Sequence, residues 1–369
     1  MERVKSATIL VSRQHLRPSL KDEWVRKLLL AVKHVKDQGW ILNSSVGSPN
    51  WEIITAAATI IAVPLKLFLP VSNTGDFENA KLTNSHNFDL ANRSVEFEAV
   101  LPKGRIPNRE EHWQQRDRAV LESSNILIPV SVRPNGTMSE LLYSAKKSDK
   151  QVTDEFEAEY DGSSTKLSYT IGRSSLSDGI KKIGNHFVFH WTRASNGPWP
   201  NERKIDFYGD VLKSTEFPRT AFRTLKRILD EKLIIASAKN MPGKTPAVSF
   251  TGLAPIDIIK LMKWRARYSQ MTFEPFGIGI EKDTALSMGI GKVQYYDIKS
   301  RKNNLSHPSW LRQSMGKITD WRNENEFRYK GNFDLNNIPT DKLIAVCFHK
   351  DEATKLENET GIKTVSFCD

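Results

Sequence analysis

Residues 125–140 read NILIPVSVRPNGTMSE, and this stretch decides the fold expected for the first half of the chain. The apolar, β-branched run at 125–132 is typical of a strand that is buried on both faces of a sheet. A helix is expected over 137–148, and residues 133–137 form the turn between the two. Because a helix N-terminus presents unpaired N–H groups and the positive end of the helix dipole, the sequence predicts an anion site at this turn.

The side chains of this turn suit a phosphate group. Gly136 carries no Cβ, so the backbone can approach a phosphate closely. Thr137 can cap the helix and donate its hydroxyl, and Arg133 places a cation beside the turn. A helix that simply starts after a glycine turn has the same residues, so the turn by itself leaves a structural and a functional interpretation open.

Strands and helices are expected to alternate around this turn. Apolar runs predict strands at 7–11, 40–42, 65–69 and 150–152, and helical spacing predicts helices at 20–37, 51–62 and 108–122. Residues 71–107 are polar, and we expect a long loop or an elaborated crossover there. The alternation predicts a Rossmann-like α/β domain over residues 1–152, with a parallel sheet and with ligands beyond the carboxyl ends of its strands.

The pattern changes in the second half of the chain. Residues 154–177 are first acidic and then rich in Ser and Gly, which predicts a linker over 153–182. Beyond it, short strands are expected at 187–190, 247–251, 277–281, 291–296, 326–329 and 344–349, with an amphipathic helix at 220–231. Many short strands with few helices predict an α+β domain over residues 183–369.

The composition is that of a globular protein. The chain has 369 residues, of which 39% are hydrophobic and 26% are charged, and this length suits two domains. The longest apolar run, residues 53–69, is interrupted by polar residues and a proline, so no membrane span is predicted. The N-terminal residues do not resemble a signal peptide. Cys347 and Cys368 cannot build a disulfide framework or a zinc site, and we expect a cytoplasmic protein without a metal.

The net charge of +11 is the unusual bulk property of the chain. It favours a polyanionic partner, which can be nucleic acid, a nucleotide or an acidic protein. A solvated basic surface explains the same charge, because Lys and Arg are spread along the chain rather than gathered in a run. The sequence contains no P-loop and no arrangement typical of a Ser-His-Asp or Cys-His nucleophile.

Residues around the turn resemble the SLOG superfamily, which includes the phosphoribohydrolases of the lonely guy type and the DNA-processing proteins of the DprA type. In that family an Arg on a helix precedes a buried strand and the motif P-G-G-x-G-T-x-x-E. Arg116 matches the Arg, and Gly136, Thr137 and Glu140 match the end of the motif. The turn with Gly47 and Ser48 lies where the family has its first glycine-rich loop.

This resemblance implies a nucleotide-binding domain over about 150 residues. The expected nucleotide-binding residues come from both turns and from the helix between them: Gly47, Ser48, Arg116, Arg133, Gly136, Thr137 and Glu140. The chain departs from the family pattern, because the paired glycines are reduced to Asn135-Gly136 and Asp117 replaces a basic residue. These departures favour ligand binding over hydrolysis, and the family also implies a homo-oligomer.

Three short motifs follow in order in the second half. His190, Trp191 and Thr192 end an expected strand, Ser249 and Thr251 share one face of another, and Glu324 and Glu326 would share one face of a third. Each has an ordinary structural explanation, as a hydrogen-bonding pair, a polar strand face or a solvated edge. Together they resemble the arrangement of ADP-ribosyltransferases, and residues 190–328 resemble bacterial proteins with a W-x-x-E-x-E-[W/F]-R signature, some of them tied to abortive infection.

The transferase resemblance implies NAD as the substrate. Glu326 is then the catalytic carboxylate that faces the ribose, and Glu324 positions or activates the acceptor. His190 holds the adenosine ribose, with Thr192 and Ser249 as support from their strands. Thr251 belongs to the same support, and Trp191 or Trp199 is expected to stack on the nicotinamide.

The two resemblances together imply a SLOG domain that senses a nucleotide and controls an NAD-consuming effector. The effector would be an ADP-ribosyltransferase or an NAD glycohydrolase in prokaryotic antiphage defence. Two alternatives stay open. The SLOG domain can itself be the enzyme, cleaving the glycosidic bond of a nucleotide through Arg116 and Glu140. The chain can also be a binding protein that grips single-stranded DNA through its basic charge.

Overall fold

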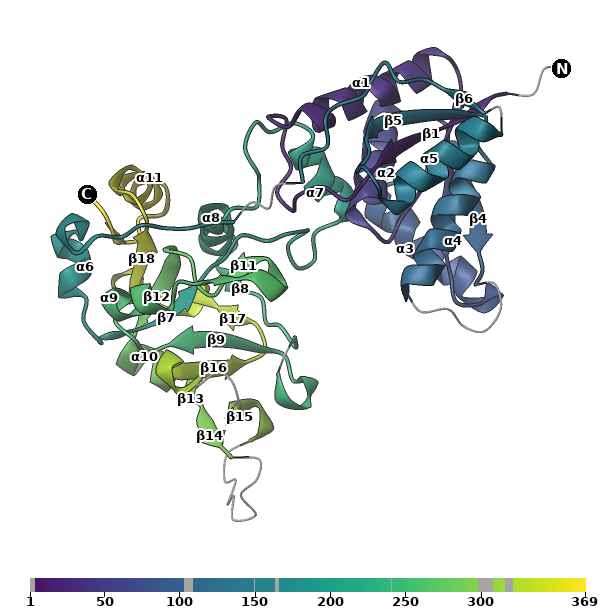
Figure 1. Ribbon diagram of the computed structural model, residues 1–369. Helices are drawn as coiled ribbons and strands as arrows, with labels where there is room; N and C mark the ends of the chain where they lie inside the picture. The colour runs from purple at the N-terminus through teal and green to yellow at the C-terminus, as the bar shows by residue number, and fades with distance from the viewer. Residues whose placement is uncertain are drawn as a thin grey trace. The chain divides into compact units, whose positions relative to one another are not determined.

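The computed structural model describes residues 4–102, 109–148, 150–162, 166–239, 241–297, 308–315 and 321–369. The chain folds into two compact units (Figure 1). The first unit consists of Met1–Thr165 and Asn196–Pro218, and the second consists of Lys166–Ser195 and Arg219–Asp369. The chain therefore passes from one unit to the other three times. We call Asn196–Pro218, which leaves the second unit and returns to it, the excursion.

The division differs from the expected one in two places. The excursion contains α7 (Lys204–Val211), whose Ile205, Phe207 and Tyr208 are buried in the core of the first unit, so the second unit is not continuous in sequence. The expected linker at 153–182 is also partly folded, because Ser177 accepts the N–H of Ile180 at 3.2 Å and starts α6 (Asp178–Lys182). Ser177, one of the small polar residues that predicted a linker, is therefore the N-cap of a helix.

The part of the first unit that the structure describes contains a six-stranded, fully parallel sheet, in the order β4-β3-β2-β1-β5-β6. The strands are β1 (Ser6–Val11), β2 (Ile41–Ser45), β3 (Leu65–Pro70), β4 (Val95–Val100), β5 (Ile126–Ser131) and β6 (Gln151–Val152). The central strands are almost continuously buried, as their apolar sequence predicts. The predicted Rossmann-like sheet is thus confirmed, and the strand order reverses between β1 and β5.

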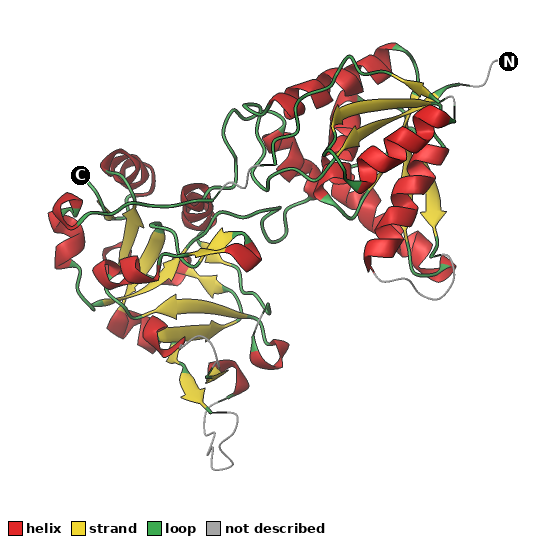
Figure 2. Cartoon of the chain, viewed as in Figure 1, coloured by secondary structure: helices red, strands yellow, loops and turns green. Residues whose placement is uncertain are grey.

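The helices of the first unit cover both faces of this sheet (Figure 2). Besides α7, they are α1 (Glu23–Asp37), α2 (Pro49–Ile61), α3 (Phe77–Phe88), α4 (Arg109–Glu122) and α5 (Thr137–Lys147). α1 and α2 pack together, and α4 and α5 pack together. α1 buries Trp24, Leu28 and Val32 at helical spacing, and α2 is buried over most of its length.

Of the two structures expected over residues 71–107, the long loop is wrong, whereas the elaborated crossover agrees with the structure, because α3 connects the parallel strands β3 and β4. Of the residues described there, Phe77–Phe88 form α3 and Val95–Val100 form the edge strand β4, while residues 103–107 lie outside the described part. The sequence of α3 lacks an apolar period, and Phe88 is the one residue of this helix that is fully buried. β4 carries Glu96 and Glu98, which pair with Lys66 at 2.9 and 2.7 Å. These cross-strand ion pairs lie on one face of the strand, while Val95, Phe97 and Ala99 on the other face pack against the core.

The second unit has a seven-stranded sheet among the residues described, in the order β13-β16-β9-β7-β12-β18-β19. These strands are β7 (Phe187–Trp191), β9 (Ala247–Thr251), β12 (Gly277–Glu281), β13 (Gly291–Lys292), β16 (Glu326–Lys330), β18 (Leu343–Cys347) and β19 (Thr364–Ser366). All neighbours are antiparallel except β18 and β19. The expected α+β domain of short strands is confirmed.

Short elements complete the second unit. Small strand pairs join β8 (Leu233–Ile234) to β17 (Phe333–Asp334), β10 (Trp264–Arg265) to β11 (Gln270–Met271), and β14 (Gln294–Tyr296) to β15 (Arg312–Ser314). The strand expected at 291–296 is therefore divided between two sheets. The remaining helices are α8 (Ala221–Glu231), α9 (Pro255–Ile258), α10 (Lys282–Ser287) and α11 (Lys350–Thr360).

The central strands β7 and β9 separate along their length. Only Phe189 and Thr251 are paired between the two strands, whereas β7 pairs with β12 over all five of its residues. On the β12 side, a Cβ on Gly279 would lie 2.5 Å from the ring of Phe189, so this glycine allows the close approach. The open side, between the end of β7 and the start of β9, is where polar side chains gather.

No helix in the described part of the chain has the length and hydrophobicity that crossing a membrane requires.

Candidate functional site

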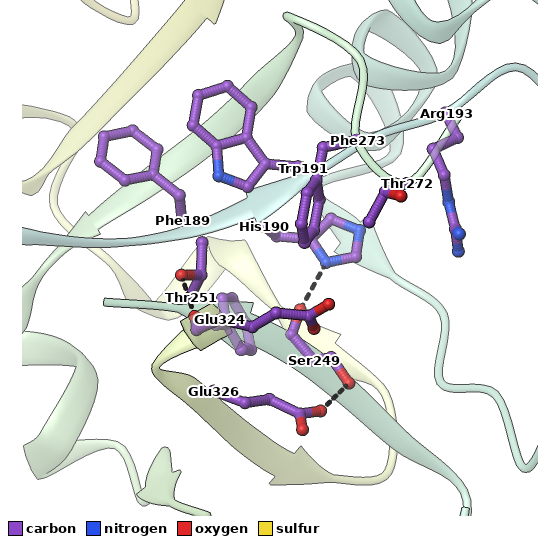
Figure 3. Close-up of a pocket in the computed structure, with 11 residues that line it drawn as sticks. Phe189, His190, Trp191, Arg193, Ser249, Thr251, Thr272, Phe273, Glu324 and Glu326 are labelled. Atoms are coloured by element: carbon purple, nitrogen blue, oxygen red, sulfur yellow. Dashed lines mark hydrogen bonds between the residues drawn. The ribbon is translucent and has the colours of Figure 1, made fainter. Parts of the chain in front are cut away.

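A cavity of about 240 Å³ lies in the second unit where β7 and β9 separate (Figure 3). Its lining residues come from β7 and the residues after it, from β9, from the segment after β11, and from β16 and the turn before it. They are Phe189, His190, Trp191, Arg193, Ser249, Phe250, Thr251, Thr272, Phe273, Glu324 and Glu326. The cavity thus brings together residues of all three motifs in the second half, which lie up to 136 positions apart, since His190 and Glu326 are both among them.

His190 replaces the missing backbone pairing between β7 and β9. Its Nδ1 lies 2.9 Å from the carbonyl oxygen of Ser249. A carbonyl only accepts, so Nδ1 carries the proton and donates it. Burial lowers the pKa of His190, with a smaller contribution from Arg193 and an opposing one from the Ser249 carbonyl. The imidazole is therefore neutral at pH 7, and its Nε2 is an acceptor without a hydrogen-bond partner among the residues described.

Glu326 is held from two sides. The Ser249 hydroxyl donates to Oε1 at 2.9 Å, and Arg328 donates from Nε to Oε1 at 2.8 Å and from Nη2 to Oε2 at 2.9 Å. Arg328 is 3% exposed, and its guanidinium also donates to the carbonyls of Trp310 and Arg312. A carboxylate can accept about four hydrogen bonds, so three leave Glu326 with one free lone pair on Oε2.

Glu324 lines the cavity, but it lies on a different element from the one predicted. It does not share a strand with Glu326, because β16 begins at Glu326 and Glu324 ends a 3-10 helix at 321–324. Between them, Asn325 has a φ of +45°, a left-handed conformation that turns the chain. The Thr251 hydroxyl donates to the carbonyl of Glu324, and the N–H of Gly252 donates to the carbonyl of Asn325 at 2.9 Å. The turn is thus tied to the end of β9.

The pKa of Glu324 is raised from 4.5 to about 7. Burial is the main cause, and the nearby charge of Glu326 adds to it, while Arg265, Arg193 and Arg328 oppose it. Glu326 has its own buried cation in Arg328. The two carboxylates therefore have different environments: Glu326 is paired with a buried cation, whereas the pKa of Glu324 near 7 suits it to proton transfer.

A second cavity of about 330 Å³ shares Arg193, Thr272, Glu324 and Glu326 with the first. Its other lining residues include Lys239, Arg265, Tyr268, Gln270, Gln313 and Arg328. Arg265 donates from Nε to the Thr272 hydroxyl at 2.9 Å. The two cavities form one cleft with the carboxylates at their junction. One lobe is lined by aromatic rings, and the other by cations.

The buried side chain of Glu274 fixes the backbone at one side of the cleft. It is 1% exposed, accepts the N–H of Ala194 at 2.7 Å on Oε1, and accepts the Tyr169 hydroxyl at 2.7 Å on Oε2. The carboxylate thereby holds the backbone next to Arg193. Sequence reasoning missed Glu274, Arg193 and Arg328. Arg328 could have been found, because it follows Glu326 by two positions on one strand face, but no local pattern marks Glu274.

Some predicted residues lie elsewhere. The Thr192 side chain is buried and donates to the carbonyls of Ala221 and Phe276 at 2.9 and 3.1 Å, so it supports the fold outside the cavity. The Trp191 indole does border the cavity, but it stacks on Phe189, with ring centroids 5.2 Å apart, and packs within a core instead of presenting a free face. Trp199 belongs to the first unit. Phe273 is the aromatic ring that lines the cavity and keeps part of its surface exposed.

In the first unit, the predicted phosphate turn is well formed. Gly136 is the N-cap of α5, its N–H donates to the Ser139 hydroxyl at 3.0 Å, and that hydroxyl donates to the Gly136 carbonyl at 2.7 Å. The left-handed residue is Asn135, with a φ of +56°, rather than Gly136. The side chains of Arg133, Thr137 and Glu140 are exposed around the helix N-terminus.

The other predicted residues of the first unit form a separate, internal group. Arg116 is 2% exposed and donates to the Val46 carbonyl at 2.8 Å and to Asp117 at 2.9 Å. It thereby holds the turn with Gly47, whose φ of +91° requires a glycine, and Ser48 is the buried N-cap of α2. Among the residues described, no hydrogen bond or ion pair joins this group to the α5 turn.

Comparisons with known proteins add little to this geometry. No family model and no curated protein matches the sequence. Among solved structures, the X-ray structure of DNA processing protein A (DprA) from Streptococcus pneumoniae matches 40% of this chain and 49% of its own, with 8% sequence identity and a TM-score of 0.29. So weak a likeness carries no argument, and the case for a function rests on the cleft itself.

Proposed function

We propose that the second unit cleaves NAD at the bond between nicotinamide and ribose, and passes the ADP-ribose to an acceptor or to water. The observation that carries this proposal is the fixed carboxylate of Glu326. It is held by Ser249 and Arg328 in a cavity that also contains His190 and Glu324. The three motifs of the transferase resemblance thus meet in one place.

The chemistry matches a fixed negative charge. As the nicotinamide–ribose bond breaks, positive charge develops on the ribose, and nicotinamide leaves with the bonding electrons. A carboxylate that is already oriented stabilises this charge without reorganisation. The free lone pair on Glu326 Oε2 can accept a ribose hydroxyl, which would place the sugar against the carboxylate.

The two lobes of the cleft suit the two ends of the substrate. The aromatic lobe, with Phe273 and the acceptor Nε2 of His190, would take nicotinamide and its ribose, so His190 would face this ribose instead of the adenosine ribose that the resemblance implies. The cationic lobe, with Arg193, Arg265 and Lys239, would take the pyrophosphate, since guanidinium groups bind phosphate oxygens well.

Glu324 would act as the general base. A carboxyl with a pKa of about 7 is half deprotonated at neutral pH and can take a proton from the attacking hydroxyl, amine or water. NAD glycohydrolysis and ADP-ribosyl transfer then differ only in what attacks the ribose. An effector that consumes NAD would arrest an infected cell, so we extend the proposal to antiphage defence.

The test is release of nicotinamide from NAD by the full chain. Glu326→Gln keeps the shape of the side chain and removes its charge, and it should lower the rate at least a hundredfold. Glu231→Gln, an exposed change at the end of α8, is the control and should leave the rate unchanged. A Glu326→Gln variant that folds and still releases nicotinamide at the wild-type rate would refute the proposal.

The same preparation separates the alternatives. Release of free base from a nucleoside monophosphate, lost in Glu140→Gln, would make the first unit a phosphoribohydrolase. The interior position of Arg116 does not favour that role. No turnover of either substrate, together with binding to single-stranded DNA that falls steeply with salt, would identify a binding protein.

A further inference from the structure

The net positive charge of the chain belongs to the second unit. Its residues, Lys166–Ser195 and Arg219–Asp369, include 30 Lys and Arg and 18 Asp and Glu, a net charge of +12. The first unit has 24 Lys and Arg and 25 Asp and Glu, a net charge of −1. A polyanionic partner is therefore expected to bind the unit that contains the cleft.

Within the second unit, the charge is concentrated in one stretch. Residues 232–273 contain seven Lys and Arg and a single acidic residue, Asp257. Three of the seven lie on the hairpin of β10 and β11, which is closed by the N–H of Thr272 donating to the Lys263 carbonyl at 2.8 Å. We call residues 263–272 the basic hairpin. It interleaves its cations with Trp264 and Tyr268, a composition typical of nucleic-acid binding.

The basic hairpin forms one wall of the cationic lobe of the cleft. Arg265 donates to the hydroxyl of Thr272, a residue that lines both lobes, so Arg265 lies towards their junction. Tyr268 lines the cationic lobe alone, and 50% of its surface is exposed. The hairpin thus extends from the junction of the lobes to the rim of the cationic lobe.

At this rim, the hairpin presents an aromatic ring beside a cation. Cζ of Arg267 lies 5.7 Å from the centroid of the Tyr268 ring, and both side chains are exposed. Proteins that bind single-stranded nucleic acid stack bases on such rings and contact the phosphates with neighbouring cations. In a duplex the bases are stacked on one another and must be flipped out before a ring can reach their faces. The rim therefore suits a single strand.

The remaining side chains of the lobe also suit a nucleotide. They are Lys239, Met241, Gln270, Met271 and Gln313. Amide groups can bond to the edge of a base, and thioethers make favourable contacts with aromatic rings. Lys239 is exposed and adds a cation. A cavity of about 330 Å³ is of the size that holds a small ligand, so it admits a single nucleotide unit rather than a duplex.

The two carboxylates of the lobe lie at its inner end. Glu324 and Glu326 line both lobes, and Glu326 is paired with Arg328. Their charge would repel a phosphate placed at the junction. The phosphates of a nucleic acid would therefore lie at the rim with Arg267, while a base above Tyr268 points inwards towards Glu324.

We propose that the basic hairpin binds single-stranded nucleic acid and that an N–H group of a bound base is the acceptor of the ADP-ribose. Binding by the hairpin stands by itself, whereas the acceptor role rests on the function proposed above. In the transfer step, the base nitrogen bonds to the ribose carbon and gives its proton to the carboxylate of Glu324. The bond from that carbon to nicotinamide breaks, and nicotinamide leaves with the bonding electrons.

Fluorescence anisotropy with the full chain tests the surface. The probes are a labelled DNA strand of about 12 nucleotides, the same strand as RNA, the DNA duplex and polyglutamate. The single strands should bind best. Tyr268→Ala should weaken their binding about tenfold, whereas Tyr268→Phe, which keeps the ring, should retain it. Arg267→Gln should lower the slope of log affinity against log salt concentration by about 0.7, the share of one phosphate contact.

Tyr143→Ala is the matched control for the aromatic ring. Tyr143 is also exposed and has Nζ of Lys147 4.5 Å from its ring centroid, but it lies on α5 in the first unit. The affinity for the single strands should not change in this variant. Absence of binding, equal binding of the duplex or of polyglutamate, or wild-type affinity in Tyr268→Ala overturns the surface.

Transfer of label from NAD with a radioactive adenylate phosphate tests the acceptor role. The full chain should move the label onto the single strand, and Tyr268→Ala should lower this transfer about fivefold when the strand is limiting. Release of nicotinamide while a bound strand stays unlabelled overturns the acceptor role and leaves the proposed function intact. If no nicotinamide is released, the proposed function and the acceptor role both fail, and the anisotropy measurements still decide the surface.

Discussion

Two carboxylates in one cleft have different surroundings, and this difference sets their expected roles. Glu326 is paired with the buried Arg328 and bonded to Ser249. Glu324 is partly buried beside Glu326, and burial with this neighbouring charge raises its pKa to about 7. Glu326 thus lies against a buried cation, whereas Glu324 is suited to exchange a proton near neutral pH.

The raised pKa of Glu324 predicts a pH dependence of activity. The deprotonated form is the base, so the rate of NAD cleavage should rise as the pH increases through about 7 and should then level off. In Glu324→Gln this rise should disappear along with most of the activity, while NAD binding persists. Nicotinamide release measured on both sides of pH 7 checks the prediction, and an unchanged pH profile in the variant would contradict it.

The same pKa predicts an effect on stability. The folded chain holds the Glu324 proton up to a pH of about 7, whereas the unfolded chain releases it near 4.5. The native state thus binds more protons between these values, and the stability contributed by this residue falls as the pH rises through that window. Glu324→Gln should therefore unfold at a higher temperature than the wild type at pH 8, with a smaller difference at pH 4.

Arg328 is a positioning residue for Glu326. Replacing it with Met removes both of its bonds to the carboxylate and leaves a partly buried charge with one partner. Losing one member of a buried pair typically costs about 3–5 kcal/mol. We expect a loss of this order in denaturant unfolding and a fall in kcat. Arg328→Lys, which keeps the charge but not the fork of two donors, should recover only part of both.

At the scale of elements, Gly252, which follows β9, packs tightly against the turn that precedes β16. A Cβ on Gly252 would lie 2.7 Å from the Asn325 amide and 2.7 Å from the ring of Phe327. Gly252→Ala should cost about 1–3 kcal/mol through overpacking and should also lower kcat, because the same turn carries Glu324. Gly197→Ala, where a Cβ meets nothing within 4 Å, is the control. Urea unfolding and nicotinamide release measure both effects.

At the scale of the whole molecule, each unit has its own core. The first core is built on the parallel sheet, and the other two lie in the second unit. We expect two unfolding transitions in calorimetry. NAD at a hundred times its Kd should stabilise only the unit that binds it, by about 2.7 kcal/mol. A single transition that shifts as a whole would mean that the excursion makes the units unfold together.

Elements with a clear apolar period could be predicted from the amino-acid sequence. The buried runs at β1 and β5 and the spacing in α1 predicted the parallel sheet, because an apolar period reports which face is buried. The sequence also singled out His190, Ser249 and Glu326, which the structure brings into one cavity. α3 and β4 escaped prediction, since α3 fully buries only Phe88 and β4 alternates charged residues with partly buried ones at the edge of the sheet.

The contacts between distant segments became known from the folded chain alone. Nothing local to the excursion indicates that α7 packs against α2, or that Glu52 lies beside Lys204. The inward orientation of Thr192 and the left-handed turn at Asn325 likewise depend on neighbours supplied by other strands. Short-range patterns record whether a residue is buried. The partner that buries it is selected by long-range packing, which no stretch of sequence carries alone.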